Sequence, residues 1–269
     1  MKNIVITGCS SGIGLETALF LREKGIKVYP SARKENDVKK LKEMGFEAFR
    51  LDLRDYESIK NTIKEVVKRD GKIDIWFNNA GYGQPGALED IETKVLKEQF
   101  ETNVFGLHEA TREVLKVMLK QGYGKIIQHS SVLGLVAMPF RGAYNASKYA
   151  VEGLSDTLRL ELKETNVHVI SLNTGPIESK FRENAKKNLK RNVDIENSRF
   201  KKIYEKTLKS EKSSVPFILP ASAVAETVYK IILAKNPKPR YYITKATYLL
   251  GFAKRVLPTS LLDRILINF

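Results

Sequence analysis

The sequence predicts an α/β fold in which a doubly wound parallel sheet is covered by helices on both faces. Two observations support this prediction. Short runs rich in Val, Ile and Phe alternate with longer segments of helical period through the first two-thirds of the chain, and buried parallel strands joined by helical crossovers produce this alternation. In addition, a glycine-rich turn separates the first apolar run from the first helical segment, which is typical of this fold class.

Each predicted strand is a short apolar run, and each predicted helix is a longer segment with one apolar face. The strands are expected at residues 3–7, 27–31, 47–52, 73–78, 124–131, 168–173 and 240–244, which gives six or seven parallel strands. The helices between them are expected at residues 12–24, 35–44, 56–69, 92–120 and 143–164, with the fourth either bent or divided in two. Right-handed crossovers place these helices on alternate sides of the sheet.

The last third of the chain departs from this pattern. Residues 179–214 are lysine-rich and polar, and we interpret them as a mobile helical insertion; a solvated helical arm without function is the alternative. A short helix at residues 221–234 and the last strand lead to a C-terminal extension at residues 246–269, in which apolar residues are interspersed with Lys and Arg. Because no repeat or linker separates these parts, the sequence predicts one domain over residues 1–269.

The composition limits the classes of function only broadly. The 46 basic and 31 acidic residues give a net charge of +15, which permits anionic partners without naming one. A single cysteine, Cys9, rules out an intramolecular disulfide and is expected to be structural, and three histidines disfavour a zinc site of cysteine and histidine. The first strand leaves no room for a signal segment, and the longest uncharged stretch is too short to span a bilayer. We therefore expect a cytoplasmic protein.

Glycines mark the turn after the first strand, where residues 7–14 read TGCSSGIG. Glycine allows positive φ in such a turn and lets the backbone approach a phosphate, whose charge is favoured at the N-terminus of the following helix. A plain structural turn is the alternative, but the position directly after an N-terminal strand favours a dinucleotide pyrophosphate site. The predicted contacts in this turn are Gly8, Ser10, Ser11, Gly12, Ile13 and Gly14.

The end of the second predicted strand indicates which dinucleotide is bound. NAD sites place a carboxylate there to bind the adenosine ribose, whereas NADP sites use arginine for the 2′-phosphate. In this sequence Arg33 and Lys34 precede the first acidic residue, Glu35. We therefore expect NADP(H) to be preferred over NAD(H) through Arg33; an exposed basic entrance to the helix is the alternative.

Tyr144 and Lys148 are four residues apart on a predicted helix, so both side chains can reach one ligand. A phenol with a pKa of about 10 is a poor base at neutral pH, and a nearby ammonium group lowers that pKa. The pair alone is common on exposed helices. Ser131 makes the pattern more specific, because it ends the preceding strand at the ligand-binding edge of the sheet, where its hydroxyl can hold a carbonyl oxygen.

Together these motifs resemble the short-chain dehydrogenase/reductase superfamily in its compact single-domain form. The resemblance covers residues 3–180: the turn matches T-G-x-x-x-G-x-G, residues 52–53 match the pair beside adenine, and residues 78–81 match the N-N-A-G run. The catalytic tetrad of the family is matched by Asn103, Ser131, Tyr144 and Lys148. The resemblance implies a Rossmann-type sheet and a nicotinamide-dependent oxidoreductase.

The resemblance also implies a role for each matched residue. Tyr144 exchanges a proton with the substrate oxygen while hydride passes between the nicotinamide and the substrate carbon. Lys148 tunes the tyrosine and binds the nicotinamide ribose, and Asn103, in a bent helix, holds a water that links Lys148 to solvent. Helix capping, a plain turn and a polar strand end are the structural alternatives for Asn103, Asn79 and Asp52. The further implied cofactor contacts are Asp52, Leu53, Asn79, Ala80, Gly81, Tyr144, Lys148, Gly175, Pro176, Ile177 and Ser179.

One loop departs from the pattern of the family. The proline-glycine pair that follows the sixth strand is replaced here by Thr174 and Gly175. Gly175 still fits a turn that faces the nicotinamide, and Ser179 stands where a threonine often meets the carboxamide. The change at Thr174 leaves the path of this backbone open, and we expect activity to be retained.

No motif selects the substrate. Apolar residues at 132–140 and the aromatic residues Phe181, Phe200 and Tyr204 favour an apolar ketone, aldehyde or alcohol, although they could simply pack the loop. The tail resembles the hydroxysteroid and retinol dehydrogenase branch of the superfamily. A reductase of 3-oxoacyl thioesters on an acidic carrier protein and a non-catalytic NADP(H)-sensing protein are the alternative functions.

The expected partners follow from the resemblance and the charge pattern. Pairing of the two long helices, residues 104–120 and 143–164, implies a homodimer or homotetramer. The basic tail at residues 248–269 could lie on an anionic membrane, but packing on the core or on a partner subunit is the favoured interpretation. Because the lysines are spread over many helices without an aromatic-basic motif, we expect no nucleic-acid binding.

Overall fold

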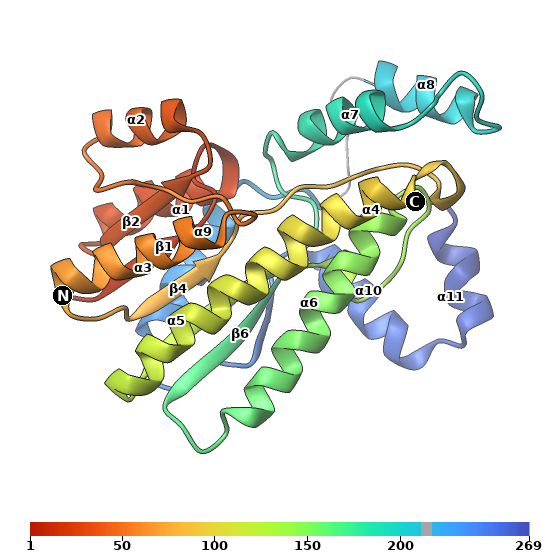
Figure 1. Ribbon diagram of the computed structural model, residues 1–269. Coiled ribbons are helices and arrows are strands. Elements are labelled where there is room, and N and C mark those ends of the chain that lie inside the picture. The colour runs from red at the N-terminus through yellow and green to blue at the C-terminus, as the bar shows by residue number, and fades with distance from the viewer. Residues whose placement is uncertain (211–216, 269) are drawn as a thin grey trace.

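In the computed structural model, which describes residues 1–210 and 217–268, seven parallel strands form one sheet with helices on both faces (Figure 1). The strand order is β3-β2-β1-β4-β5-β6-β7. Their bounds are β1 (Asn3–Ile6), β2 (Lys27–Ala32), β3 (Phe49–Arg50), β4 (Ile75–Asn78), β5 (Gly124–Ser131), β6 (Val167–Thr174) and β7 (Arg240–Tyr242). The predicted α/β fold is confirmed, and the order reverses between β1 and β4, where such sheets bind ligands at the strand ends.

Two apolar layers lie on opposite faces of the sheet because side chains alternate along each strand. Ile4 and Ile6 of β1 pack toward α1, α2 and α9, whereas Val5 packs toward α3 and α5. Trp76 lies on the same side as Val5 and is fully buried. The helices are α1 (Gly12–Glu23), α2 (Glu35–Glu43), α3 (Tyr56–Asp70), α5 (Leu107–Gln121), α6 (Gly142–Glu161) and α9 (Ser222–Leu233).

The fourth predicted helix is bent, as expected, and the bend has a definite form. A π-helical segment, η2 (Glu101–Gly106), joins α4 (Thr93–Phe100) to α5. At its end the helix backbone approaches the loop after β3 closely, since a Cβ on Gly106 would lie 2.2 Å from the carbonyl oxygen of Leu53. This segment carries Asn103, so the irregular turn sets where that side chain projects.

The predicted insertion forms two helices, α7 (Phe181–Asn192) and α8 (Lys201–Lys209), while its residues 211–214 lie outside the described residues. The helices are bonded to the loop that follows β4. Asn188 Nδ2 donates to the Gly83 carbonyl at 3.1 Å, and the Tyr204 hydroxyl accepts from the Ala87 amide at 2.8 Å. Tyr204 also donates to the Asp90 carboxylate. The insertion is therefore attached to the loop after β4 rather than a free solvated arm.

The C-terminal extension forms α10 (Lys245–Val256) and α11 (Thr259–Leu266). One face packs on the loop after β5, where Leu250 and Leu262 meet Val132 and Val136. This contact confirms that the extension covers part of the core. The opposite face of α10 is exposed and apolar, with Phe252 67% accessible. Within residues 1–210 and 217–268, every helix is too short or too polar to cross a membrane.

Candidate functional site

The glycine turn has the geometry of a phosphate cradle. Gly8 and Gly12 have φ values of 76° and 60°, a region that glycine adopts without strain. A Cβ on Gly14 would lie 2.4 Å from the Gly8 carbonyl oxygen, so the turn packs too closely for a larger residue. Ser11, the N-cap of α1, makes no side-chain capping hydrogen bond, which leaves the first amides of α1 for an anion. These residues fit the diphosphate of a dinucleotide.

The N-N-A-G run lies against this turn and fixes its shape. Asn79 Nδ2 donates to the carbonyl oxygens of Thr7 and Gly8 at 2.9 and 3.2 Å. The amides of Asn79 and Ala80 both donate to Thr7 Oγ1 at 3.0 Å. Asn79 thus supports the turn, while the neighbouring Asn78 is buried and bonded to core side chains.

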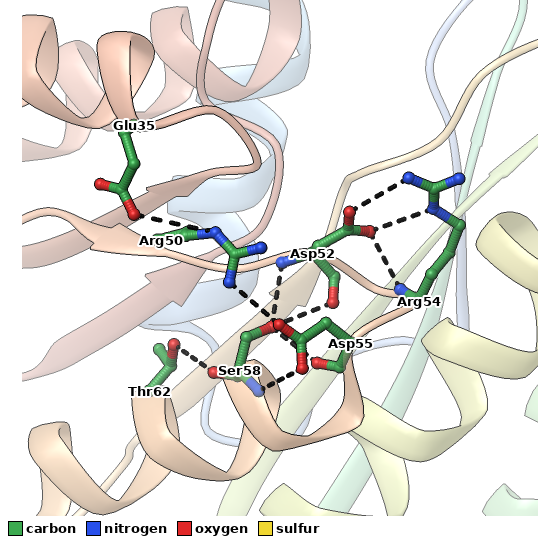
Figure 2. A network of polar contacts seen from close by, with 7 residues as sticks. All are labelled: Glu35, Arg50, Asp52, Arg54, Asp55, Ser58 and Thr62. Carbon is green, nitrogen blue, oxygen red and sulfur yellow. Dashed lines mark hydrogen bonds and ion pairs between the residues drawn. The ribbon is translucent and has the colours of Figure 1, made fainter.

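A network of polar and charged residues surrounds Asp52, just after β3 (Figure 2). Arg54 Nη2 lies 3.3 Å from Asp52 Oδ2, and the Arg54 amide donates to Asp52 Oδ1 at 3.0 Å. Burial opposes ionisation of Asp52, but the contacts with Arg54 and the charge of Arg33 outweigh it and lower the carboxyl pKa. The sequence-based reasoning missed Arg54. Its position two residues after Asp52 is the signal that could have identified it.

Arg33 follows β2 directly and is exposed. The first acidic residue after it, Glu35, is directed toward Arg50, whose Nε lies 3.7 Å from Glu35 Oε1 (Figure 2). Leu53 is buried in the core on the α3 and α5 side, so only its backbone is available to a ligand. Glu35, the nearest carboxylate that follows Arg33 in the sequence, is therefore paired with Arg50.

Tyr144, Ser131 and Lys148 converge at the carboxyl end of β5. The Ser131 hydroxyl and the Tyr144 phenol interact, and Lys148 Nζ lies 5.6 Å from the centre of the Tyr144 ring. The ring of Phe181 from α7 packs edge-on against Tyr144, with centroids 5.4 Å apart. A hydroxyl, a phenol and an ammonium group therefore meet beside an aromatic wall, which is an arrangement suited to proton transfer to a bound oxygen.

Burial dominates the ionisation of these groups. It raises the pKa of Tyr144 to about 12, and the Ser131 hydroxyl only partly offsets the rise. Burial lowers the pKa of Lys148 to about 8, although the charge of Glu152 opposes this change. Lys148 Nζ donates to the His129 carbonyl at 2.6 Å. The pKa of Tyr144 therefore lies above that of a free phenol in this structure, and a lowering of that pKa by Lys148 stays a prediction.

Asn103 is buried on the π-helical segment with its side chain fully engaged. Its Nδ2 donates to the Tyr82 carbonyl at 2.9 Å and to Ser147 Oγ at 3.3 Å, and its Oδ1 accepts from the Tyr82 amide at 3.1 Å. These bonds hold the loop after Gly81 against α6. The predicted water link from Asn103 to Lys148 stays a prediction.

The altered loop after β6 lies over the glycine turn. A Cβ on Gly12 would lie 3.2 Å from the Cβ of Ser179, and one on Gly175 would lie 2.0 Å from Thr244 Oγ1. Gly175 therefore allows the loop to pass close to the start of α10. The structure brings residues 175–179 to the same crevice as the glycine turn and the N-N-A-G run, and their cofactor contacts stay a prediction.

The apolar residues that follow Ser131 divide into two groups. Val132 and Val136 are buried against α10 and α11, so they pack the loop as the structural alternative held. Phe140 packs against Phe200 and Tyr204 at the base of the insertion. Of the three predicted aromatic residues, Phe181 packs its ring against that of Tyr144.

The described residues provide neither a reactive thiol nor a metal-binding group. Cys9 is buried, and burial raises the pKa of its thiol to about 12, so it is structural as expected. In the described part of the chain no group of His, Cys, Asp and Glu side chains could hold a metal ion.

The fold and this set of side chains define a class of protein that comparison with known families identifies. Residues 2–190 match the family model described as short chain dehydrogenase. The chain belongs to the short-chain dehydrogenase/reductase family. It is an oxidoreductase of class EC 1.1.1.- that acts on a carbonyl or alcohol group with a nicotinamide cofactor.

Individual relatives are similar over nearly the whole chain. An uncharacterized oxidoreductase of Escherichia coli K12, YbbO, is 38% identical over 266 residues, which cover 98% of this chain and 94% of the relative. The NADPH-dependent 3-dehydrocapnine reductase of Ornithobacterium rhinotracheale is 31% identical, with 98% and 96% covered. A solved variant of actinorhodin polyketide ketoreductase with NADPH has a TM-score of 0.76 at 30% identity, with 93% and 97% covered.

Proposed function

We propose that this protein reduces an apolar ketone or aldehyde with NADPH, with Tyr144 as the proton donor, in a reaction that is reversible in principle. The observation that carries the proposal is the convergence of Tyr144, Ser131 and Lys148 at the carboxyl end of β5. The glycine turn and the exposed Arg33 occupy the same edge of the sheet. The related 3-dehydrocapnine reductase and the similar ketoreductase structure are both described with NADPH.

Each residue near the phenol has a task in the proposed reaction. A bound nicotinamide would supply the hydride for the carbonyl carbon. Ser131 donates a hydrogen bond to the carbonyl oxygen and holds it beside Tyr144. Tyr144 then delivers its phenolic proton to that oxygen, and burial favours the protonated form that this step requires. Lys148 stabilises the phenolate that remains and would bind the nicotinamide ribose.

The substrate is proposed to be apolar because of what surrounds the phenol. Phe181 contacts the Tyr144 ring, and Met138 and Leu257 border the same apolar cluster. An apolar substrate group that covers these side chains displaces water from them and gains binding energy. The tail of residues 239–258, which resembles the hydroxysteroid and retinol dehydrogenase branch, supports a bulky substrate. We do not assign a particular ketone.

A substrate screen that follows NADPH absorbance tests the proposal. The wild type and Tyr144→Phe are compared on a panel of apolar and polar ketones and aldehydes, with NADPH and NADH in parallel. We expect turnover of apolar carbonyls with NADPH and its loss in the variant. Wild-type turnover by Tyr144→Phe would refute the assigned proton donor, and equal use of the two cofactors would refute the selectivity.

The other functions that the sequence left open have distinct outcomes in the same screen. Tight NADPH binding without turnover of any carbonyl would favour a cofactor-sensing protein. Turnover confined to 3-oxoacyl thioesters would favour a carrier-dependent reductase. The homodimer or homotetramer stays a prediction, which light scattering of the purified chain tests.

A further inference from the structure

His129 lies near the end of β5, between the two loops that flank the proposed nicotinamide site. Its Nδ1 is 3.1 Å from Asn79 Oδ1, on the loop after the neighbouring strand β4. Its Nε2 is 3.2 Å from Thr174 Oγ1, at the end of β6 on the other side. The imidazole therefore bridges the carboxyl ends of three adjacent strands.

The bonding pattern around the ring fixes the position of its proton. Asn79 Nδ2 already donates to Thr7 and Gly8, so Asn79 Oδ1 is the atom that faces the imidazole and must accept. His129 Nδ1 consequently carries the hydrogen, and Nε2 can accept from the Thr174 hydroxyl, which also lies 3.4 Å from the Ser130 carbonyl oxygen. Burial and the charge of Lys148 lower the pKa of His129 to about 3, which keeps the ring neutral.

The backbone of the same residue touches the catalytic group. Lys148 Nζ donates to the His129 carbonyl oxygen at 2.6 Å. The ring also packs against Phe77 of β4, with centroids 5.8 Å apart. One residue thus joins the Asn79 support of the glycine turn, the altered loop after β6 and the ammonium group of Lys148.

We propose that His129 is a positioning residue that sets the spacing between the Asn79 loop and the Thr174 loop, and hence the fit of the nicotinamide half of the cofactor. Thr174 stands where the family pattern has proline, a residue without a hydroxyl, so the bridge is a feature of this chain. The inference rests on the proposed function, because it assumes that a nicotinamide dinucleotide binds in this crevice. The adenosine end, with Arg33 and Arg54, lies outside the bridge.

Two ligands separate this role from general structural damage: NADPH, which fills both ends of the site, and 2′,5′-ADP, which fills only the adenosine end. Dissociation constants for both are measured by calorimetry on wild type, His129→Leu and His129→Gln. We expect His129→Leu to weaken NADPH binding by about tenfold, the loss of two hydrogen bonds, and to leave 2′,5′-ADP within about twofold. Glutamine, which has a donor and an acceptor, should restore part of the affinity.

Further variants control this comparison. Thr174→Val removes the hydroxyl at nearly constant volume and should weaken NADPH binding in the same selective way. The double variant, with both His129→Leu and Thr174→Val, should lose less binding free energy for NADPH than the two single variants lose in sum, because both substitutions disrupt one bridge. His168→Leu changes another partly buried histidine near the start of β6 and should alter neither constant. If His129→Leu does not fold, the comparison of Thr174→Val with wild type decides the question.

The outcomes are distinct. Equal weakening of both ligands would make His129 a structural residue, and unchanged NADPH affinity in a folded variant would overturn the bridge. A wild-type chain that fails to bind NADPH would refute the proposed function itself. Wild type that binds NADPH but turns over no carbonyl would leave the bridge supported by the binding data while the proposed activity fails.

Discussion

Replacing Lys148 with methionine should remove activity and increase stability at neutral pH. Lys148 is 6% exposed, and burial lowers its pKa from 10.5 to about 8. The folded protein therefore holds an ammonium group that its surroundings disfavour. Methionine has a similar length and no charge, so it removes this penalty.

The size of the effect follows from the pKa difference. At pH 7, a change from 10.5 to about 8 corresponds to about 3 kcal/mol against the charged form in the folded protein. The variant also loses the 2.6 Å hydrogen bond to the His129 carbonyl, which lowers its stability by about 1 to 2 kcal/mol. We expect Lys148→Met to be more stable than wild type by about 1 to 2 kcal/mol at pH 7.

The stability gap should depend on pH with a definite sign. Between the folded pKa of about 8 and the unfolded value of 10.5, the unfolded wild type binds more protons than the folded form. Wild-type stability therefore rises with pH in this range, while that of Lys148→Met lacks this contribution. The advantage of the variant should shrink by about 1.3 kcal/mol between pH 7 and pH 9.

Urea unfolding of both proteins at the two pH values tests this reasoning, and a gap that stays constant or widens with pH would refute it. Lys125→Met is the matched control, since burial also lowers the Lys125 pKa to about 8. Lys125 Nζ, however, donates to three carbonyls at the end of α9: Ile231, Ile232 and Ala234. We expect this control to be less stable than wild type at pH 7 and to retain activity.

Three further variants test other parts of the site. Tyr144→Phe should lower kcat by about 10²- to 10⁴-fold while NADPH still binds, as fluorescence titration would measure; an unchanged kcat contradicts the assignment. Arg33→Ala should weaken NADPH binding by about tenfold or more and leave NADH binding nearly unchanged, because the charge-assisted contact is with the 2′-phosphate; parallel losses would argue against it. Gly14→Ala should abolish NADPH binding, because the new Cβ would lie 2.4 Å from the Gly8 carbonyl oxygen. Gly153→Ala, where a Cβ would meet no atom within 4 Å, is its control and should raise stability by about 0.5 to 1 kcal/mol in thermal unfolding.

The sheet was largely predictable because its local signals agree with its tertiary structure. The predicted strand at residues 124–131 matches β5 in both bounds. The predicted strand at residues 47–52 shrinks to Phe49–Arg50, a two-residue edge strand that pairs only with β2. Apolar composition alone could not show that its flanking residues would form turns, such as the one in which the Ala48 amide bonds the Phe46 carbonyl.

The sequence identified residues of the candidate site, but it could not show the contacts between them. The motifs placed Ser131, Tyr144 and Lys148 on adjacent elements, and the structure brings these three together. Spacing could not show that burial raises the pKa of the phenol, because burial depends on the whole fold. The contacts of His129 with Asn79 and Thr174 join residues that folding brings close together, and His129 belongs to no recognised motif.

The contact of α10 and α11 with the loop after Ser131 gives the two ends of the chain different proposed roles. In the proposed function, the glycine turn after β1 belongs to the nucleotide half of the site, whereas α10 and α11 support the loop that follows Ser131. Exchange of these two helices among relatives would then change the proposed substrate side and leave binding of the coenzyme intact. The carboxyl terminus is therefore the natural place to re-engineer substrate choice.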